Sequence, residues 1–317
     1  MASVNTLQCL VAPANTGVGA CYADIKNIVG MIICPPNYFI TATQAATLQT
    51  KLNADALNDS KGLRIYPVGP FVDFKDDSEK RVVEQFSYGG QKTVRDPVYK
   101  WSFRFNVGGY ELLKSLRSFN GGNWSVLFVD GNNQLWGSNY TASDGAGIAG
   151  IPLIELYTDP FMINDGKKNT EYWTSIVFYP INLMDNGAYI KNPGFDVVDT
   201  LEGIQNVVLA SKTNATAKTF TVIPTTNEGT LMSSLYGTQL AAVGAWTAKN
   251  HETGASLTIT GVTQDSVSGG FNIVVGATNY PTVGTGHVDI NLVGPTELAA
   301  LNVSPYESTG LVSIVAS

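Results

Sequence analysis

Carboxylates and cations crowd together in one short stretch, Asp73–Arg81, where seven of the nine residues are ionisable. Neighbouring carboxylates of this kind can coordinate Ca²⁺ or perform acid–base chemistry. The stretch lacks the D-x-D-x-D-G pattern of a calcium loop, however, and its interleaved cations would oppose a bound metal ion. Two interpretations therefore come ahead of a metal or catalytic site: a solvated loop between two strands, or a loop that contacts a neighbouring subunit, where mixed charge sets orientation. The residues of this hypothetical contact are Asp73, Lys75, Asp76, Asp77, Glu79, Lys80 and Arg81.

Other catalytic and cofactor-binding templates fail on residue type or on context. Gly145–Gly150 matches G-x-G-x-x-G, but a predicted strand follows it, so no helix N-terminus is available for a pyrophosphate and a mobile loop is expected. The sequence contains neither a phosphate-binding loop nor G-x-S-x-G. A hydrolase would have to join His251 or His287, the only histidines, to a carboxylate and a nucleophile. We therefore predict that the chain is not an enzyme and has no catalytic residue, metal site or cofactor.

The cysteines and the tryptophans were the remaining candidates for a binding site. Cys9, Cys21 and Cys34 fit neither a CxxC pair nor a zinc site, so they are predicted to be small buried hydrophobic residues. Exposed aromatic side chains can form a sugar-binding platform, but the five tryptophans are scattered over predicted strands, where core packing is the default. A glycan-binding adhesin, with Trp246 in its binding module, stays as an alternative.

Composition predicts two charge-poor domains. The chain has 317 residues, of which only 14% are charged, and a formal net charge of −7; about 25% charged residues is usual. Residues 1–195 hold 16 basic and 17 acidic side chains, whereas 196–317 hold 3 and 9. The acidic balance argues against recognition of nucleic acid. The N-terminal sequence does not resemble a signal peptide, and the longest apolar stretch, Ile28–Cys34, is too short to span a bilayer.

In the first domain, the hydrophobic pattern changes from helical to strand spacing after Gly62. Residues 41–59 are good helix formers, with a threonine at the front to cap the helix. Aromatic and polar residues alternate over 99–107, as in a half-buried antiparallel strand. A second helix over 110–119 has a leucine face and ends at a glycine pair. A hairpin is predicted over 124–138, with further strands over 151–159 and 170–182. This order predicts an antiparallel β-sandwich or barrel with a flanking α-helix.

In the second domain, short β-runs recur about every ten residues and are separated by Gly, Asn, Pro or Thr turns. This spacing predicts a β-sandwich of immunoglobulin-like size, although the Cys…Trp…Cys marker of a true immunoglobulin domain is missing. Residues 231–243 fit either a helix or a strand pair. The fold class is therefore mainly β: a sandwich or barrel over 1–195 and a C-terminal immunoglobulin-like sandwich over 196–317.

Few charges, many strands and four glycine pairs together favour a self-assembling protein. Soluble monomers normally protect exposed strand edges with charged side chains, and this chain has few charged side chains for that purpose. The centres of obligate interfaces are also rich in aromatic residues and poor in Lys, Glu and Asp. We therefore expect the strand edges to be unguarded and to be used in contacts between identical chains.

The stretch Gly62–Ser138, from RIYPVGPFVDF through KWSFRFNVGGYELLKSLRSF to WSVLFVD, resembles structural proteins of tailed bacteriophages, and its element order is similar to that of tail-tube proteins. In that family a β-sandwich with a flanking helix forms stacked, usually hexameric rings around a DNA channel. The resemblance implies that Asp73–Arg81 is an inter-ring loop, residues 1–34 an arm, Leu112–Phe119 the flanking helix and 196–317 an external decoration.

The same resemblance implies the partners and the location of the protein. It would be a homo-oligomer in a virion assembled in the bacterial cytoplasm, in contact with other tail proteins, with DNA passing non-specifically through the lumen. A capsid-decoration or neck protein, or a host-attachment protein, stays as an alternative. The strand face Lys100/Ser102/Arg104/Asn106 is a candidate lumenal face, but its two cations conflict with the neutral or acidic surface expected there.

Overall fold

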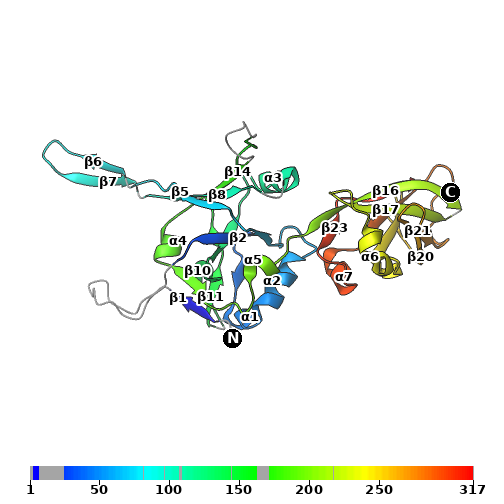
Figure 1. The fold of residues 1–317 in the computed structure, drawn as a ribbon, viewed down its shortest axis with the longest axis horizontal. Coiled ribbons are helices and arrows are strands. Elements are labelled where there is room, and N and C mark those ends of the chain that lie inside the picture. Colours follow the sequence, from blue (N-terminus) through cyan, green and yellow to red (C-terminus); the bar gives the residue numbers. More distant parts are fainter. Residues whose placement is uncertain are drawn as a thin grey trace. The chain divides into compact units, whose positions relative to one another are not determined.

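The computed structural model describes residues 3–6, 25–80, 82–95, 97–106, 109–143, 145–162, 171–216 and 218–316. These form two compact units (Figure 1). The first unit comprises Met1–Ala56 and Ser60–Glu202, and the second comprises Leu57–Asp59 and Gly203–Ser317. The main division thus falls between Glu202 and Gly203. Both units are mainly β, with predominantly antiparallel strand pairs, as the sequence predicted.

A nine-stranded sheet forms the centre of the first unit. Its main path has the strand order β1-β15-β10-β9-β2-β4, and β11, β3 and β12 are attached to that path. The bounds are β1 Val4–Thr6, β2 Ile28–Cys34, β3 Phe39–Ile40, β4 Tyr66–Val68, β9 Ser125–Asp130, β10 Leu135–Ala142, β11 Gly145–Ala149, β12 Ile151–Pro152 and β15 Gly187–Ile190.

Both faces of this sheet are buried at its central strand β9. Along β9, Val126 and Phe128 pack into one apolar core, while the alternate residues Leu127 and Val129 pack into a second core on the opposite face. Side chains alternate between the two faces of a strand, so a strand covered on both sides is apolar throughout, as the hydrophobic run WSVLFVD shows.

One face is covered by a four-stranded antiparallel sheet in the order β13-β14-β8-β5. The bounds are β5 Asp73–Asp76, β8 Tyr99–Phe105, β13 Glu155–Thr158 and β14 Tyr172–Phe178. The alternation predicted for 99–107 is confirmed over β8, since Trp101, Phe103 and Phe105 are in the core shared by the two sheets. The first unit is therefore a β-sandwich.

Five helices lie among the described residues of the first unit: α1 Ala42–Ala45, α2 Leu48–Ala56, α3 Gly109–Arg117, α4 Ile181–Met184 and α5 Val197–Thr200. The flanking helix is α3, which buries Leu113 and Leu116. The single helix expected over 41–59 is instead broken into α1 and α2, because the N–H groups of Ala46 and Thr47 bond to carbonyls three residues back. Thr41 caps α1 as predicted, in a reciprocal pair with Gln44.

The second unit is a sandwich of a five-stranded sheet, β20-β21-β17-β16-β23, and a four-stranded sheet, β19-β18-β22-β24. Its strands are β16 Gln205–Thr216, β17 Thr219–Thr226, β18 Trp246–Asn250, β19 Ser256–Leu257, β20 Ile259–Asp265, β21 Gly270–Val275, β22 His287–Leu292, β23 Tyr306–Ser308 and β24 Val312–Val315. Its helices are α6 Met232–Leu240, the 3₁₀ turn Val243–Ala245 and α7 Pro295–Ala300.

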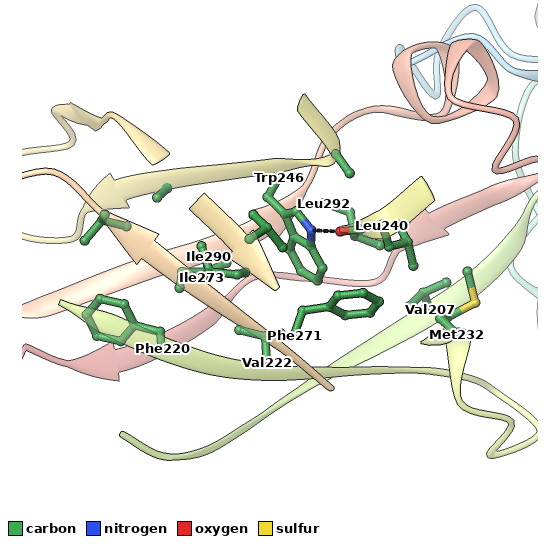
Figure 2. Close-up of a cluster of buried hydrophobic side chains, with 14 of the residues drawn as sticks. Val207, Phe220, Val222, Met232, Leu240, Trp246, Phe271, Ile273, Ile290 and Leu292 are labelled. Carbon is green, nitrogen blue, oxygen red and sulfur yellow. Dashed lines mark hydrogen bonds between the residues drawn. The ribbon is translucent and has the colours of Figure 1, made fainter. Parts of the chain in front are cut away.

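Trp246 lies in the core of the second unit, among side chains from both sheets and from α6 (Figure 2). Its ring is 5.7 Å from that of Phe271, and its indole N–H donates to the carbonyl of Leu240 at 2.8 Å. The undecided segment 231–243 is thus mainly helix: α6 packs Met232 and Leu240 into this core, with a kink at Tyr236.

Gly137 on β10 offers a stability test of the first sandwich. A Cβ atom there would clash with the Ala149 carbonyl oxygen and lie 2.7 Å from Leu127 Cδ2. Because a backbone atom cannot step aside as a side chain can, we expect Gly137→Ala to destabilise the first unit by about 1–3 kcal/mol, measured as a lower urea midpoint. Gly62→Ala, where a Cβ meets nothing within 4 Å, is the control. Equal midpoints for the two variants would contradict the prediction.

Candidate functional site

The charged stretch singled out from the sequence begins as a strand and not as a loop. Asp73–Asp76 is β5, an edge of the four-stranded sheet, paired with β8 through the register Asp73↔Arg104. It is held there by Phe74, whose ring lies 5.4 Å from Trp101 and 5.6 Å from Phe103. Asp77, Glu79 and Lys80 follow β5, and Arg81 lies outside the described residues.

The carboxylates of this stretch bond to protein groups and do not converge on a common point. Asp77 pairs with Lys75 at 2.6 Å and accepts from the Ser102 hydroxyl at 3.3 Å. Asp76 accepts from the N–H of Ser78 at 3.0 Å. Among the described residues, no group of three or more His, Cys, Asp or Glu side chains is placed to hold a metal ion. The described carboxylates of this stretch are therefore engaged in local hydrogen bonds and ion pairs.

The outer face of the four-stranded sheet is polar, as the alternation in β8 predicted. Arg104 lies between Asp73, at 3.5 Å, and Glu171, at 3.1 Å, and stacks over the Trp173 ring at 5.9 Å. Ser102 shares a hydrogen bond of 3.0 Å with Ser175 on the neighbouring strand. The cations of this face are thus largely neutralised by carboxylates of the same face.

Each edge of this sheet has one position at which a polar side chain occupies the backbone, so the edges are not entirely unprotected as expected. On β13, the Asn120 side chain accepts from Thr158 N–H at 2.8 Å and donates to Thr158 C=O at 3.2 Å, as a neighbouring strand would. On β5, the carboxylate of Asp73 accepts from Phe74 N–H at 2.9 Å. These polar side chains occupy backbone groups that could otherwise pair with another chain.

The β-hairpin that follows β5 was not predicted from the sequence. Strands β6 (Val82–Gln85) and β7 (Gln91–Arg95) pair only with each other and reach away from the sheets of the first unit (Figure 1). No described side chain over 82–93 is buried. The available signal was the pair Gly89-Gly90 between two polar, β-branched runs, since Gly89 has φ +84° and such turns favour glycine.

Two stacked aromatic rings mark the tip of this hairpin. Phe86 and Tyr88 are 5.4 Å apart with only 2° between their planes, and Tyr88 is 80% exposed. The turn is closed by hydrogen bonds from Phe86 N–H to Gly90 C=O and from Gly89 N–H to Phe86 C=O. The turn therefore presents the Tyr88 ring to solvent, with the partly buried Phe86 ring stacked against it.

The G-x-G-x-x-G match is also a strand, not the mobile loop expected. Gly145–Ala149 is β11, paired with β10 and β3, and no helix follows it. At Gly147 a Cβ would come within 2.7 Å of the Ile40 carbonyl oxygen. The glycines here serve close strand packing, and the segment presents no helix end to a dinucleotide.

The two histidines come together in the second unit, each beside a carboxylate. His251 Nδ1 is 2.9 Å from Asp289, and His287 Nδ1 is 3.4 Å from Glu252. The hydrogen bond and the charge of Asp289 raise the pKa of His251 above its usual value. Within the described chain, neither imidazole is bonded to a hydroxyl or thiol, so a nucleophile–base pair for hydrolysis is not assembled here.

Cys34 and the five tryptophans are each buried or half-buried. Cys34 is buried, which raises the pKa of its thiol, while Cys9 and Cys21 lie outside the described residues. None of the five tryptophans is exposed, and Trp246 in particular is 4% exposed. No surface platform of tryptophan rings is therefore available for stacking on a sugar.

A cavity of about 230 Å³ in the first unit is lined by three aspartates and by apolar residues. Asp130 is fully buried, and its two carboxylate oxygens accept N–H groups from the backbone and from Trp136. Asp196 caps α5 through the N–H groups of Val198 and Asp199. These carboxylates thus serve the local fold.

Comparisons with protein-family models, with curated proteins and with solved structures found no match to this chain. In the part of the chain that the structure describes, no helix has the length and apolar character needed to cross a membrane.

Proposed function

We propose that this chain is a structural virion protein that assembles into stacked rings and forms the tail tube of a tailed bacteriophage. It works by shape, with no active site and no cofactor. The observation that carries the proposal is the β6–β7 hairpin, which buries none of its described side chains over 82–93 against its own chain and presents an aromatic pair at its tip.

The β6–β7 hairpin has little to stabilise it within its own chain. An isolated two-stranded hairpin is marginally stable in water, and exposed aromatic rings are characteristic of interface centres. A hairpin of this kind gains its stability from a partner surface. Its position, immediately after the mixed-charge stretch, fits a contact in which charge at the base sets orientation and the apolar tip supplies burial.

The polar face of the four-stranded sheet supports the lumenal placement that the sequence left in doubt. Carboxylates outnumber cations on the face that carries Lys100 and Arg104 of β8. Two of these carboxylates, Asp73 and Glu171, neutralise Arg104. Cross-strand register and hydrogen bonds place on this face the acids Asp73, Asp77, Glu155, Asp159 and Glu171 and the bases Lys75, Lys100 and Arg104. A net acidic wall does not retain a passing polyanion.

Exposed apolar side chains near the ends of β13 and β14 offer a second contact between copies. Each is between 49% and 56% exposed: Ile154, Tyr179, Ile181 and Met184. We propose that these residues join neighbouring subunits within a ring, which usually has six subunits, while the hairpin joins one ring to the next. The second unit then decorates the outside, and other tail proteins meet the ends of the tube in a virion assembled in the bacterial cytoplasm.

The experiment is negative-stain electron microscopy of the purified full chain, with sizing at several concentrations. Rings or tubes of uniform diameter are expected. Discrete closed rings that never stack would instead favour a neck or capsid-decoration protein, and a stable monomer at high micromolar concentration would overturn self-assembly altogether. A glycan array tests the adhesin alternative, for which no exposed tryptophan is present.

A further inference from the structure

The two histidines of the chain are direct cross-strand neighbours in the second unit. His251 follows β18 and His287 opens β22, and these strands pair antiparallel up to Asn250↔Val288. The backbone N–H of His251 then donates to the carbonyl of His287 at 3.0 Å. The two rings lie 5.9 Å apart, centroid to centroid, with 62° between their planes.

Each ring is oriented by a carboxylate at the same ring nitrogen. His251 Nδ1 contacts both oxygens of Asp289, at 2.9 and 3.1 Å. His287 Nδ1 lies 3.4 Å from Glu252, whose same oxygen also accepts the backbone N–H of His287 at 2.8 Å. Within the residues that the structure describes, neither Nε2 atom has a hydrogen-bond partner. A carboxylate that holds Nδ1–H leaves the Nε2 lone pair available as a ligand, which is the outer-shell arrangement common at metal-binding histidines.

We propose that His251 and His287 together bind one divalent transition-metal ion of the Zn²⁺, Cu²⁺ or Ni²⁺ class through their Nε2 atoms. Imidazole suits these ions, and Cu²⁺ binds tightest in the usual order. Two imidazoles that share an ion at about 2.0–2.1 Å in tetrahedral geometry have centroids about 5 Å apart, close to the 5.9 Å between these two rings. The side chains are 55% and 41% exposed, which leaves them room to move.

The site is open, with two protein ligands and the remaining positions filled by water. The described residues provide no third ligand, since no group of three His, Cys, Asp or Glu side chains is placed to hold a metal ion. Asp289 and Glu252 act as positioning residues because their contacts are to the Nδ1 side of the rings. The inference concerns the second unit alone and does not depend on the tail-tube proposal.

The test is titration of the full chain with Cu²⁺, followed by calorimetry and by electron paramagnetic resonance. We expect one ion per chain and a spectrum with two coordinated imidazole nitrogens. The chain has no other histidine, so His251→Ala/His287→Ala should abolish that spectrum, and each single variant should leave one nitrogen. Zn²⁺ should compete for the site. Circular dichroism confirms that the variants are folded.

A variant of Asp289 and a matched control test whether this carboxylate positions His251 for Cu²⁺ binding. Asp289→Asn is expected to weaken Cu²⁺ binding about 10–100-fold while both nitrogens stay in the spectrum. Asp265→Asn, whose carboxylate bonds to Ser268 and not to a histidine, should change neither quantity. Unchanged binding in the double histidine variant, or a spectrum without imidazole nitrogen in the unmodified chain, would overturn the proposal.

Discussion

Replacement of residues 83–93 by a short Gly-Asn-Gly turn is expected to abolish stacking into tubes while single rings still form. The hairpin lends no buried side chain over this range to the core of the first unit, so its loss should change the free energy of unfolding by no more than about 0.5 kcal/mol. The aromatic tip is expected to supply most of the contact, because desolvated aromatic anchors dominate interface energies. Pelleting at high speed and negative-stain images measure the loss of tubes directly.

Point variants separate the tip of the hairpin from its base. Tyr88→Ser should reduce the pelleted fraction, whereas Tyr110→Ser, which removes a 70% exposed tyrosine from α3 of the same unit, should not. Reversal of the charges of Lys80 and Arg81, by substitution with Glu, tests the mixed-charge stretch that precedes the hairpin. Tubes of normal length from the hairpin-replaced chain would exclude the hairpin as the stacking contact, whatever the rings show.

Truncation of Trp246 to alanine is expected to destabilise the second unit by about 3–5 kcal/mol, the usual cost of emptying a large aromatic site in a core. The side chain is 4% exposed, packs between the two sheets of the sandwich and bonds to the carbonyl of Leu240. Its removal therefore leaves both a cavity and an unpaired carbonyl oxygen. Urea denaturation followed by circular dichroism measures the change.

Trp246→Phe separates the two contributions in part, since it removes the hydrogen bond but only a small part of the buried ring volume. We expect it to cost about 1–3 kcal/mol, the penalty for an unsatisfied buried group. A Trp246→Ala chain as stable as the unmodified protein would contradict the core assignment. The same buried position means that loss of glycan binding in this variant would report unfolding and would not identify a sugar site.

Local periodicity predicted the elements that pack in a regular way. The alternation from Tyr99 to Phe105 and the leucine face of α3 identified buried residues correctly, because strand and helix geometry alone set which side chains share a face. The helix expected over 41–59 was wrong at Ala46–Thr47, since helix propensity does not reveal where the backbone changes to hydrogen bonds three residues back. The glycine-rich segment 145–149 was missed as a strand because its packing against Ile40 is set by a distant element.

The candidate sites depended on information that local sequence does not carry. Asp73–Asp76 became a strand because Phe74 finds aromatic partners on β8, and the guard of β13 comes from Asn120, far away in sequence. The histidine pair likewise follows from the register of β18 with β22. No spacing rule connects positions 251 and 287, so only the sheet topology brings them together.

Each unit is closed by joining its first described strand to one of its last. In the first unit β1 pairs with β15, through Val4↔Ile190, and in the second unit β16 pairs in parallel with β23, through Gln205↔Tyr306. A nascent chain leaving the ribosome therefore cannot complete either sheet until nearly the whole of that unit has been synthesised. The first unit can therefore close while the second is still being translated.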